Sequence, residues 1–112
     1  MQKPEKIALA FWRSPNVREP TRDWFRNLSD SDRLVVGTDL RRVQYGWPLG
    51  MPLVKAMGDG LWEVRSSLPS RREARVLFII DSGGILVLNG FIKKTQKTPI
   101  AEINLARKRM KE

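Results

Sequence analysis

The residues of this chain that could do chemistry lie in three short runs whose apolar pattern predicts β-strands. Alternate side chains of a strand share a face, so each run would present its charged groups on one side of a small sheet. Cationic groups gathered in this way could bind a phosphate and stabilise negative charge that develops on it. The candidate catalytic residues are Glu63, Arg65, Arg75, Lys93 and Lys94.

The chain contains no histidine and no cysteine. This excludes the usual zinc sites and any Ser-His or Cys-His dyad, and we expect neither a metal nor a cofactor. Attack on a phosphate without a metal needs a group that takes the proton of the nucleophile. Arginine keeps its proton in proteins, so Arg65 and Arg75 could only bind phosphate and stabilise charge. A lysine crowded by other cations loses its proton more readily, which makes Lys93, Lys94 or Lys97 a candidate acid–base group.

Several of these residues also have a purely structural interpretation. Glu63 is the carboxylate nearest to Arg65 on the same strand face, and the two could form a surface ion pair worth under ~1 kcal/mol. Arg75 lies in a dense apolar run, where a charge needs a partner or a ligand. Trp47, among the prolines and glycines of the segment 46–52, is either a loop anchor or a contact residue for RNA or a protein.

The remaining RNA-binding candidates are basic residues near the C-terminus. Lys97 precedes the last predicted helix, and Arg107, Lys108 and Arg109 lie in its last turns. The three helical residues could bind phosphate without sequence preference, or they could complement the negative end of the helix dipole. The lysines before the helix could equally be solvated turn residues.

The composition indicates one globular domain that spans residues 1–112. The hydrophobic share is 41%, the charged share is 29% and the net charge is +9. Such an excess of positive charge favours encounter with polyanions, so we expect a nucleic-acid partner. The alternatives are a role in solubility alone, an acidic protein or an anionic membrane surface. No apolar run approaches ~18 residues, and the N-terminus lacks the apolar core of a signal peptide, so we expect a cytoplasmic protein without a membrane span.

Hydrophobic periodicity predicts an α+β domain with the element order β-α-α-β-β-β-α. The last three strands would form a small antiparallel sheet with the helices packed on it, and the first strand is expected to be buried on both faces. The predicted strands cover 7–12, 61–68, 73–80 and 85–92, and the first two helices cover 17–28 and 29–46.

The ends of two predicted helices carry recognisable caps. The second helix would begin at the cap residue Ser29 and end at Gly46. Its inner line would consist of Val36, Leu40 and Val43. The last helix would begin with Thr98 as the cap and Pro99 in the first turn.

Four segments of the chain resemble the RelE/ParE toxin superfamily, and most closely its phage-derived HigB-like branch. The last segment is the most specific, because its glycine, paired lysines and Thr-Pro helix start occur together at a fixed spacing. The likeness covers nearly the whole chain and weakens only near the N-terminus. The four segments are 44–52 (QYGWPLGMP), 60–65 (GLWEVR), 74–78 (ARVLF) and 90–99 (GFIKKTQKTP).

The resemblance implies the toxin of a type II toxin–antitoxin pair, an mRNA endoribonuclease (mRNA interferase) that acts on the translating ribosome and inhibits translation. A cognate helix-turn-helix antitoxin would silence it. Arg65 and Arg75 match strand arginines of the family, and Lys93 and Lys94 lie where the last strand of the relatives delivers a basic group. The C-terminal tyrosine of some relatives and the histidines of others have no counterpart here, so the resemblance does not identify the general base.

Two other functions remain open from the sequence. A ParE-like toxin would poison gyrase through protein contact and would cut no nucleic acid. A catalytically inactive module would retain only antitoxin or RNA binding. The convergence of cations on the predicted strands favours the nuclease.

Overall fold

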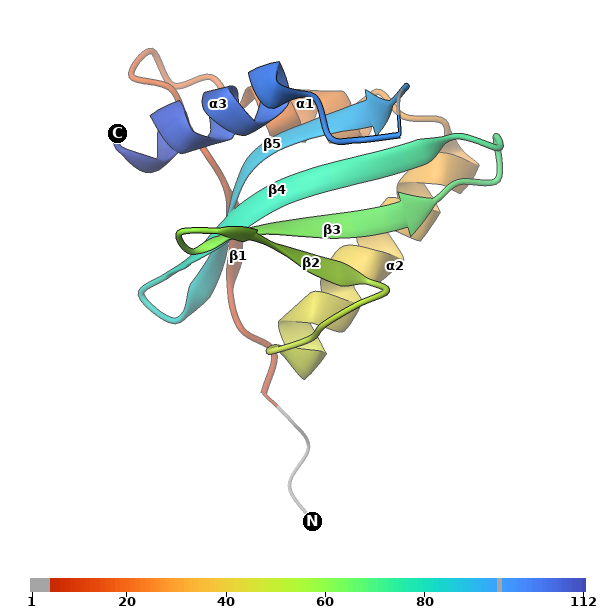
Figure 1. The fold of residues 1–112 in the computed structure, drawn as a ribbon, viewed down its shortest axis with the longest axis horizontal. Helices are drawn as coiled ribbons and strands as arrows, with labels where there is room; N and C mark the ends of the chain where they lie inside the picture. The colour runs from red at the N-terminus through yellow and green to blue at the C-terminus, as the bar shows by residue number, and fades with distance from the viewer. Residues whose placement is uncertain (1–4, 95) are drawn as a thin grey trace.

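A five-stranded mixed sheet and three helices form the domain (Figure 1). The structure is a computed structural model that describes residues 5–94 and 96–112. The strands lie in the order β1-β5-β4-β3-β2. The predicted α+β class is confirmed, as is the antiparallel meander, which consists of β3, β4 and β5. In chain order the elements are β1 (Leu9–Phe11), α1 (Pro20–Arg26), α2 (Asp30–Gly46), β2 (Val54–Gly58), β3 (Leu61–Ser67), β4 (Glu73–Asp81), β5 (Gly84–Lys93) and α3 (Ile100–Met110).

The sheet differs from the prediction at both of its edges. β2, which the predicted order lacks, pairs antiparallel with β3 and makes the order β-α-α-β-β-β-β-α. It is short and follows a proline-rich segment, so its strand conformation depends on the pairing with β3. At the other edge β1 lies parallel to β5, so the sheet is not wholly antiparallel. β1 has three residues and is only partly buried, because an edge strand lacks a neighbour on one side; the prediction of burial on both faces was wrong.

The first helix is shorter than the predicted range 17–28. α1 begins at Pro20, whose fixed φ suits the first turn of a helix. Val17, expected within the helix, is 67% exposed and has a φ of 64°. A residue in the left-handed region cannot continue a right-handed helix. The chain therefore turns at Val17 before α1 starts.

The second helix follows the prediction. The Ser29 side chain caps α2 by accepting a hydrogen bond from a backbone N–H of the first turn at 3.3 Å. The predicted inner line of Val36, Leu40 and Val43 is buried in an apolar cluster with strand residues on one face of the sheet. Gly46 is the last helical residue. α2 thus covers one face of the sheet and leaves the other to α3.

The third helix covers only part of the opposite face. Ile103, Ala106 and Met110 of α3 pack in a second apolar cluster, and the helix contacts β4 and β5. Figure 1 shows α3 at the β5 side of the sheet, with β2 and β3 lying in front without a helix over them. The helix begins one residue later than predicted, because Pro99 takes the cap position and the Thr98 hydroxyl bonds to a strand residue instead. The uncovered part of the sheet is where the charged side chains gather.

Candidate phosphate-binding site

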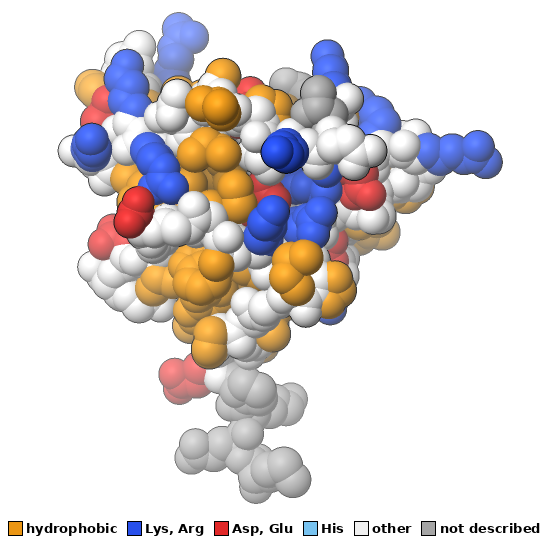
Figure 2. Space-filling view, viewed as in Figure 1, with side chains coloured by type: hydrophobic (Ala, Val, Ile, Leu, Met, Phe, Trp, Pro, Cys, Tyr) orange, Lys and Arg blue, Asp and Glu red, His pale blue; other side chains and the backbone are white. Residues whose placement is uncertain are grey.

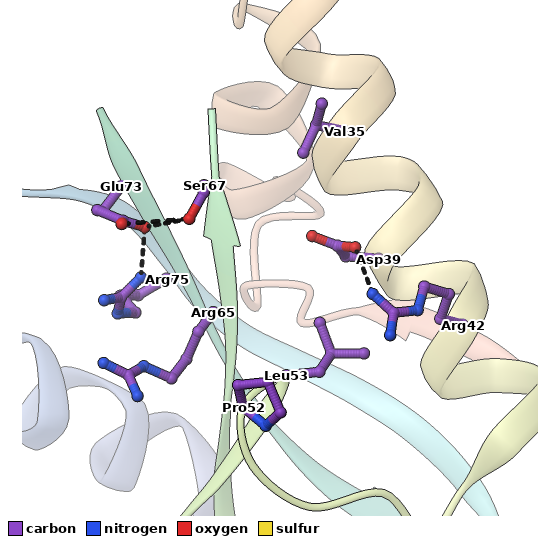
Figure 3. A pocket seen from close by; sticks show the side chains of 9 residues that line it. All are labelled: Val35, Asp39, Arg42, Pro52, Leu53, Arg65, Ser67, Glu73 and Arg75. Carbon is purple, nitrogen blue, oxygen red and sulfur yellow. Dashed lines mark hydrogen bonds and ion pairs between the residues drawn. The ribbon is translucent and has the colours of Figure 1, made fainter. Parts of the chain in front are cut away.

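Strand register places the two predicted arginines side by side. Arg65 of β3 pairs with Arg75 of β4, which in turn pairs with Phe91 of β5. Directly paired residues point to the same face of a sheet, so both guanidinium groups emerge on the face that α3 covers in part. Figure 3 shows the two side chains extending to the same side of β3, away from α2. Like charges at paired positions repel each other, and this arrangement requires a nearby anion.

Glu63 is the anion that both arginines share. Its side chain is 2% exposed, and its Oε1 lies 3.7 Å from Arg75 Nε and 4.0 Å from Arg65 Nε. Its Oε2 accepts a hydrogen bond from the Thr98 hydroxyl, which lies just before α3. The predicted Glu63–Arg65 ion pair is therefore present, but it is not a surface pair, because Glu63 is buried. Tertiary packing buries the carboxylate and makes it a fixed counter-charge.

Arg75 is held from several sides and is 3% exposed. Its Nη1 donates hydrogen bonds to the Ala74 carbonyl oxygen at 3.0 Å and to Glu73 Oε2 at 3.3 Å. Together with Glu63 at its Nε, these contacts supply the partners that a charge in an apolar run needs. Arg75 is consequently a rigid positive group whose position is set by two carboxylates.

Arg65 has fewer protein partners than Arg75. Its side chain is 30% exposed, and its Nη1 lies 3.6 Å from the Met51 sulfur, which is a weak acceptor. Its buried Nε has no hydrogen-bond partner among the described residues. A guanidinium presents five N–H donors in a fork that matches phosphate, and a buried donor without an acceptor is costly. The exposed N–H groups of Arg65 could bind an anionic ligand, so its geometry is compatible with a phosphate-binding role.

The two arginines line a hollow of about 260 Å³ on the open part of the sheet, which we name the cationic hollow. It brings together five of the predicted residues, namely Glu63, Arg65, Arg75, Lys93 and Lys97. Figure 2 shows Lys and Arg side chains gathered beside acidic ones on this face of the molecule. The complete lining is Lys55, Met57, Glu63, Arg65, Arg75, Lys93, Gln96, Lys97, Thr98 and Ile103.

Lys55 is a cation of the hollow that the sequence interpretation missed. It lies on β2 directly opposite Glu63 of β3, so its side chain shares that face. The face of Lys55 cannot be assigned without β2, which the predicted order lacks. The segment 54–57 (VKAM) shows no clear alternation of apolar and polar residues, so no local signal identified the strand or the lysine.

A second hollow, of about 460 Å³, continues from the two arginines around the edge of β3 toward α2 (Figure 3). The pairing of β2 with β3 reaches only Val64, which leaves the end of β3 as an open edge. On the α2 side Arg42 lies 3.4 Å from Asp39, and Asp39 also accepts a hydrogen bond from Ser66 Oγ at 2.7 Å. The charges on that side balance each other, so the excess positive charge lies in the cationic hollow.

Two other predicted residues lie outside the cationic hollow. Lys94 is exposed and lines a groove on the far side of Lys93. Trp47 packs edge-on against Trp62 and Phe78, with ring centroids 5.0 and 5.4 Å apart. These ring contacts favour the interpretation of Trp47 as a loop anchor.

In the basic cluster of α3, two residues make structural contacts with the sheet and one is exposed to solvent. Arg107 Nη2 donates a hydrogen bond to the Met57 carbonyl oxygen at 3.1 Å. Arg109 Nη1 donates to the Leu88 carbonyl oxygen at 2.7 Å, and its guanidinium lies 4.4 Å from the centre of the Trp12 ring. These two arginines tie α3 to the sheet, whereas the third basic residue of the cluster, at position 108, is exposed.

A buried carboxylate that the sequence interpretation did not include fixes the turn between β3 and β4. Asp32 of α2 is 0% exposed and accepts hydrogen bonds from Ser70 Oγ at 2.8 Å and from Arg72 Nη2 at 3.1 Å. Burial alone would raise the pKa of Asp32, but the hydrogen bonds from Ser70 and Arg72 outweigh it and lower the pKa. The turn leads into β4, so this contact supports the register that sets Arg65 opposite Arg75.

The fold and the site define a class of small basic α+β domains, in which cations converge around a buried carboxylate on an open sheet face. The family model described as "Phage derived protein Gp49-like (DUF891)" matches residues 23–111. The chain belongs to this family. The family is associated with the toxins of toxin–antitoxin systems.

Three further findings bear on the class of protein. A comparison with curated proteins gave no match. Within residues 5–94 and 96–112, no helix is both long and apolar enough to cross a membrane. In the same part of the chain, no three acidic side chains gather in a group that could hold a metal ion.

Proposed function

We propose that this protein is the toxin of a type II toxin–antitoxin pair, and that it cuts mRNA on the translating ribosome as a metal-independent endoribonuclease. Membership of the family supports the toxin class. The nuclease rests on one observation, the Arg65 guanidinium. Its buried Nε lacks a hydrogen-bond partner among the described residues, and the group faces a hollow lined by four other cations. A phosphate in the hollow would pair with the exposed N–H groups of this guanidinium, whose side chain is 30% exposed, and would offset the gathered positive charge.

In the proposed reaction the scissile phosphate binds against Arg65 and Arg75. The 2′-hydroxyl attacks the adjacent phosphorus, the bond to the 5′-oxygen breaks, and a 2′,3′-cyclic phosphate forms. Negative charge develops on the non-bridging oxygens in the transition state. Arg75 is held in place by Glu63 and Glu73, so it can stabilise that charge without reorganisation. Arg65, with spare donors, completes the contact with the phosphate.

In this mechanism the lysines of the cationic hollow transfer the protons. Glu63 is 2% exposed and is already bonded to Thr98 and to both arginines, so we assign it as a positioning residue. Lys55, Lys93 and Lys97 line the same hollow, and a lysine amine can take the proton of the 2′-hydroxyl or give one to the leaving 5′-oxygen. Such a base would be slow by itself. The ribosome would offset this by holding the mRNA in line for attack.

A type II toxin also requires a partner that silences it. We propose that a cognate helix-turn-helix antitoxin binds this chain in the cytoplasm. Expression of the chain alone is then expected to arrest bacterial growth with loss of intact transcripts, and co-expression of the neighbouring gene product is expected to restore growth. Arrest with intact transcripts would contradict the nuclease and would favour contact with gyrase.

The direct test combines the purified protein with translating ribosomes and maps new mRNA ends by primer extension. We expect new ends with ribosomes present and few or none on free mRNA. The control is Arg13→Ala, which removes one positive charge from an exposed side chain outside the hollow. Cleavage should survive Arg13→Ala and be lost in Arg65→Ala. Equal loss in both variants would mean that only the overall charge matters, and the assignment of the hollow would fail.

A further inference from the structure

A groove beside the cationic hollow has the size and lining of a nucleobase site. Its volume is about 710 Å³, which lies within the usual range of ligand sites. It follows the end of β5 between α1 and the start of α3, and Trp24, Phe91 and Pro99 contribute apolar and aromatic surface to it. We name it the β5 groove.

The β5 groove adjoins the cationic hollow. Lys93 lines both, so an RNA strand with a phosphate in the hollow would pass over Lys93 into the groove. Arg72 and Lys94 add further positive charge there. The Arg72 side chain is 49% exposed, although its Nη2 lies 3.1 Å from Asp32, so it retains donors for a ligand. Both the adjacency of the two pockets and their positive charge fit a polyanionic strand.

Glu102 is the acidic residue of the β5 groove, and it is held in one position. Its Oε2 accepts a hydrogen bond from the side-chain amide of Asn89, a residue that is 6% exposed. A fixed carboxylate repels phosphate but accepts N–H groups from the edge of an unstacked base. Guanine offers two adjacent N–H donors on its Watson–Crick edge. Uracil offers one N–H between two carbonyl oxygens, which a carboxylate repels.

We propose that the β5 groove binds the base of the nucleotide next to the scissile phosphate, and that Glu102 makes the groove prefer guanine. The inference rests on the proposed function, because it takes single-stranded RNA as the ligand of the hollow. Trp24 offers an aromatic surface to the base. Lys94 and Arg72 pair with the phosphate of the same nucleotide.

The experiment measures binding with 2′-O-methyl RNA tetranucleotides, which cannot be cleaved through the 2′-oxygen. One probe is all uridine, and the others carry a single guanosine at each position in turn. NMR signals of the ¹⁵N-labelled protein report each region, the groove through the Trp24 indole N–H and the Lys94 amide, and the hollow through Arg65 Nε–H and the Thr98 amide. We expect both regions to respond and one guanosine probe to bind about tenfold more tightly than the uridine probe.

The specificity test is Glu102→Gln, with Glu112→Gln as the matched control at the exposed end of the chain. Glutamine keeps an oxygen that can accept the Asn89 amide, so the wall of the groove is preserved. The ratio of guanosine to uridine affinity should fall to about one in Glu102→Gln and remain about tenfold in the control. An unchanged ratio in Glu102→Gln would overturn the assignment of Glu102.

The remaining outcomes separate this inference from the proposed function. Signal changes confined to the hollow would overturn the groove as a base site while leaving RNA as the ligand of the hollow. A lack of response in both regions would contradict RNA binding itself, and with it the proposed function. If poly-glutamate, and not RNA, moves the groove signals, the groove belongs to an acidic protein partner and the nucleobase proposal is wrong.

Discussion

Arg65→Ala is expected to slow RNA cleavage strongly and to leave the protein folded. In the structure the Arg65 guanidinium makes an ion pair at 4.0 Å with Glu63 and a contact of 3.6 Å with the Met51 sulfur. A partly exposed pair of this length is worth about 1 kcal/mol or less. Glu63 keeps its contacts with Arg75 and Thr98 in the variant. For a domain of this size, we expect the melting temperature to fall by no more than about 4–8 °C.

The expected effect on the reaction is much larger than the effect on stability. Arg65 would donate to the phosphate oxygens on which charge develops in the transition state. Removal of one such donor costs about 2.7–4 kcal/mol in transition-state stabilisation, which is a factor of 10²–10³ in rate. The cleavage rate on translating ribosomes, measured per folded molecule under single-turnover conditions, should fall by this factor.

A comparison with Arg75→Ala separates an effect on the cleavage rate from an effect on the stability of the fold. Arg75 is 4% exposed in its side chain and pairs with Glu63 and Glu73, so its removal leaves buried Glu63 poorly compensated. Loss of one partner of a buried pair costs about 3–5 kcal/mol, and denaturant unfolding should reveal this loss. Near-wild-type cleavage by folded Arg65→Ala would refute the phosphate-binding role. A stability loss as large as that of Arg75→Ala would refute the claim that Arg65 has spare donors.

Three further predictions follow from packing, protonation and charge. Gly90→Ala should destabilise the fold by about 1–3 kcal/mol in denaturant unfolding, because a Cβ at Gly90 would lie 2.6 Å from the Trp24 ring; unchanged stability would contradict the tight packing. The folded pKa of Asp32 is lowered, so its contribution is present above about pH 4 and is lost as the pH falls through that lowered pKa. Asp32→Asn should weaken this acid dependence, and an unchanged pH profile would contradict the role of Asp32. With about four phosphate contacts to single-stranded RNA, log K should fall against log salt with a slope near −3, and a flat response would indicate an acidic protein partner.

Local sequence signals were sufficient to predict the helices and strands that are specified by residues close together in the chain. Ser29 caps α2, and Val36 and Leu40 lie on its buried side, because capping and helical periodicity act within a few turns. The strand containing Arg65 and the strand containing Arg75 were predicted from alternation and apolar density, and their pairing follows from a short turn. The candidate cations on these strands therefore met in one hollow as expected.

The features that depend on non-local contacts could not be read from the chain. The β2 segment carries no local sequence signal of a strand. The position of Lys55 opposite Glu63 is therefore defined only when β2 and β3 pair. The burial of Glu63 depends on Thr98 and α3, which lie far along the chain. Sequence spacing placed Lys94 beside Lys93, yet only Lys93 also lines the cationic hollow, because strand alternation and the end of the sheet turn Lys94 away from it.

By itself the sequence determined that this is a basic α+β domain without histidine or cysteine, whose strands bear arginines and lysines. Those properties follow from composition and from short-range periodicity. Only the tertiary structure decided which cations are neutralised and which remain open to a ligand. Arg75 is buried and held by two carboxylates, whereas the Arg65 side chain is 30% exposed and lies 4.0 Å from Glu63. That difference arises because hydrogen bonding and desolvation depend on residues brought together by folding, and neither can be read from spacing along the chain.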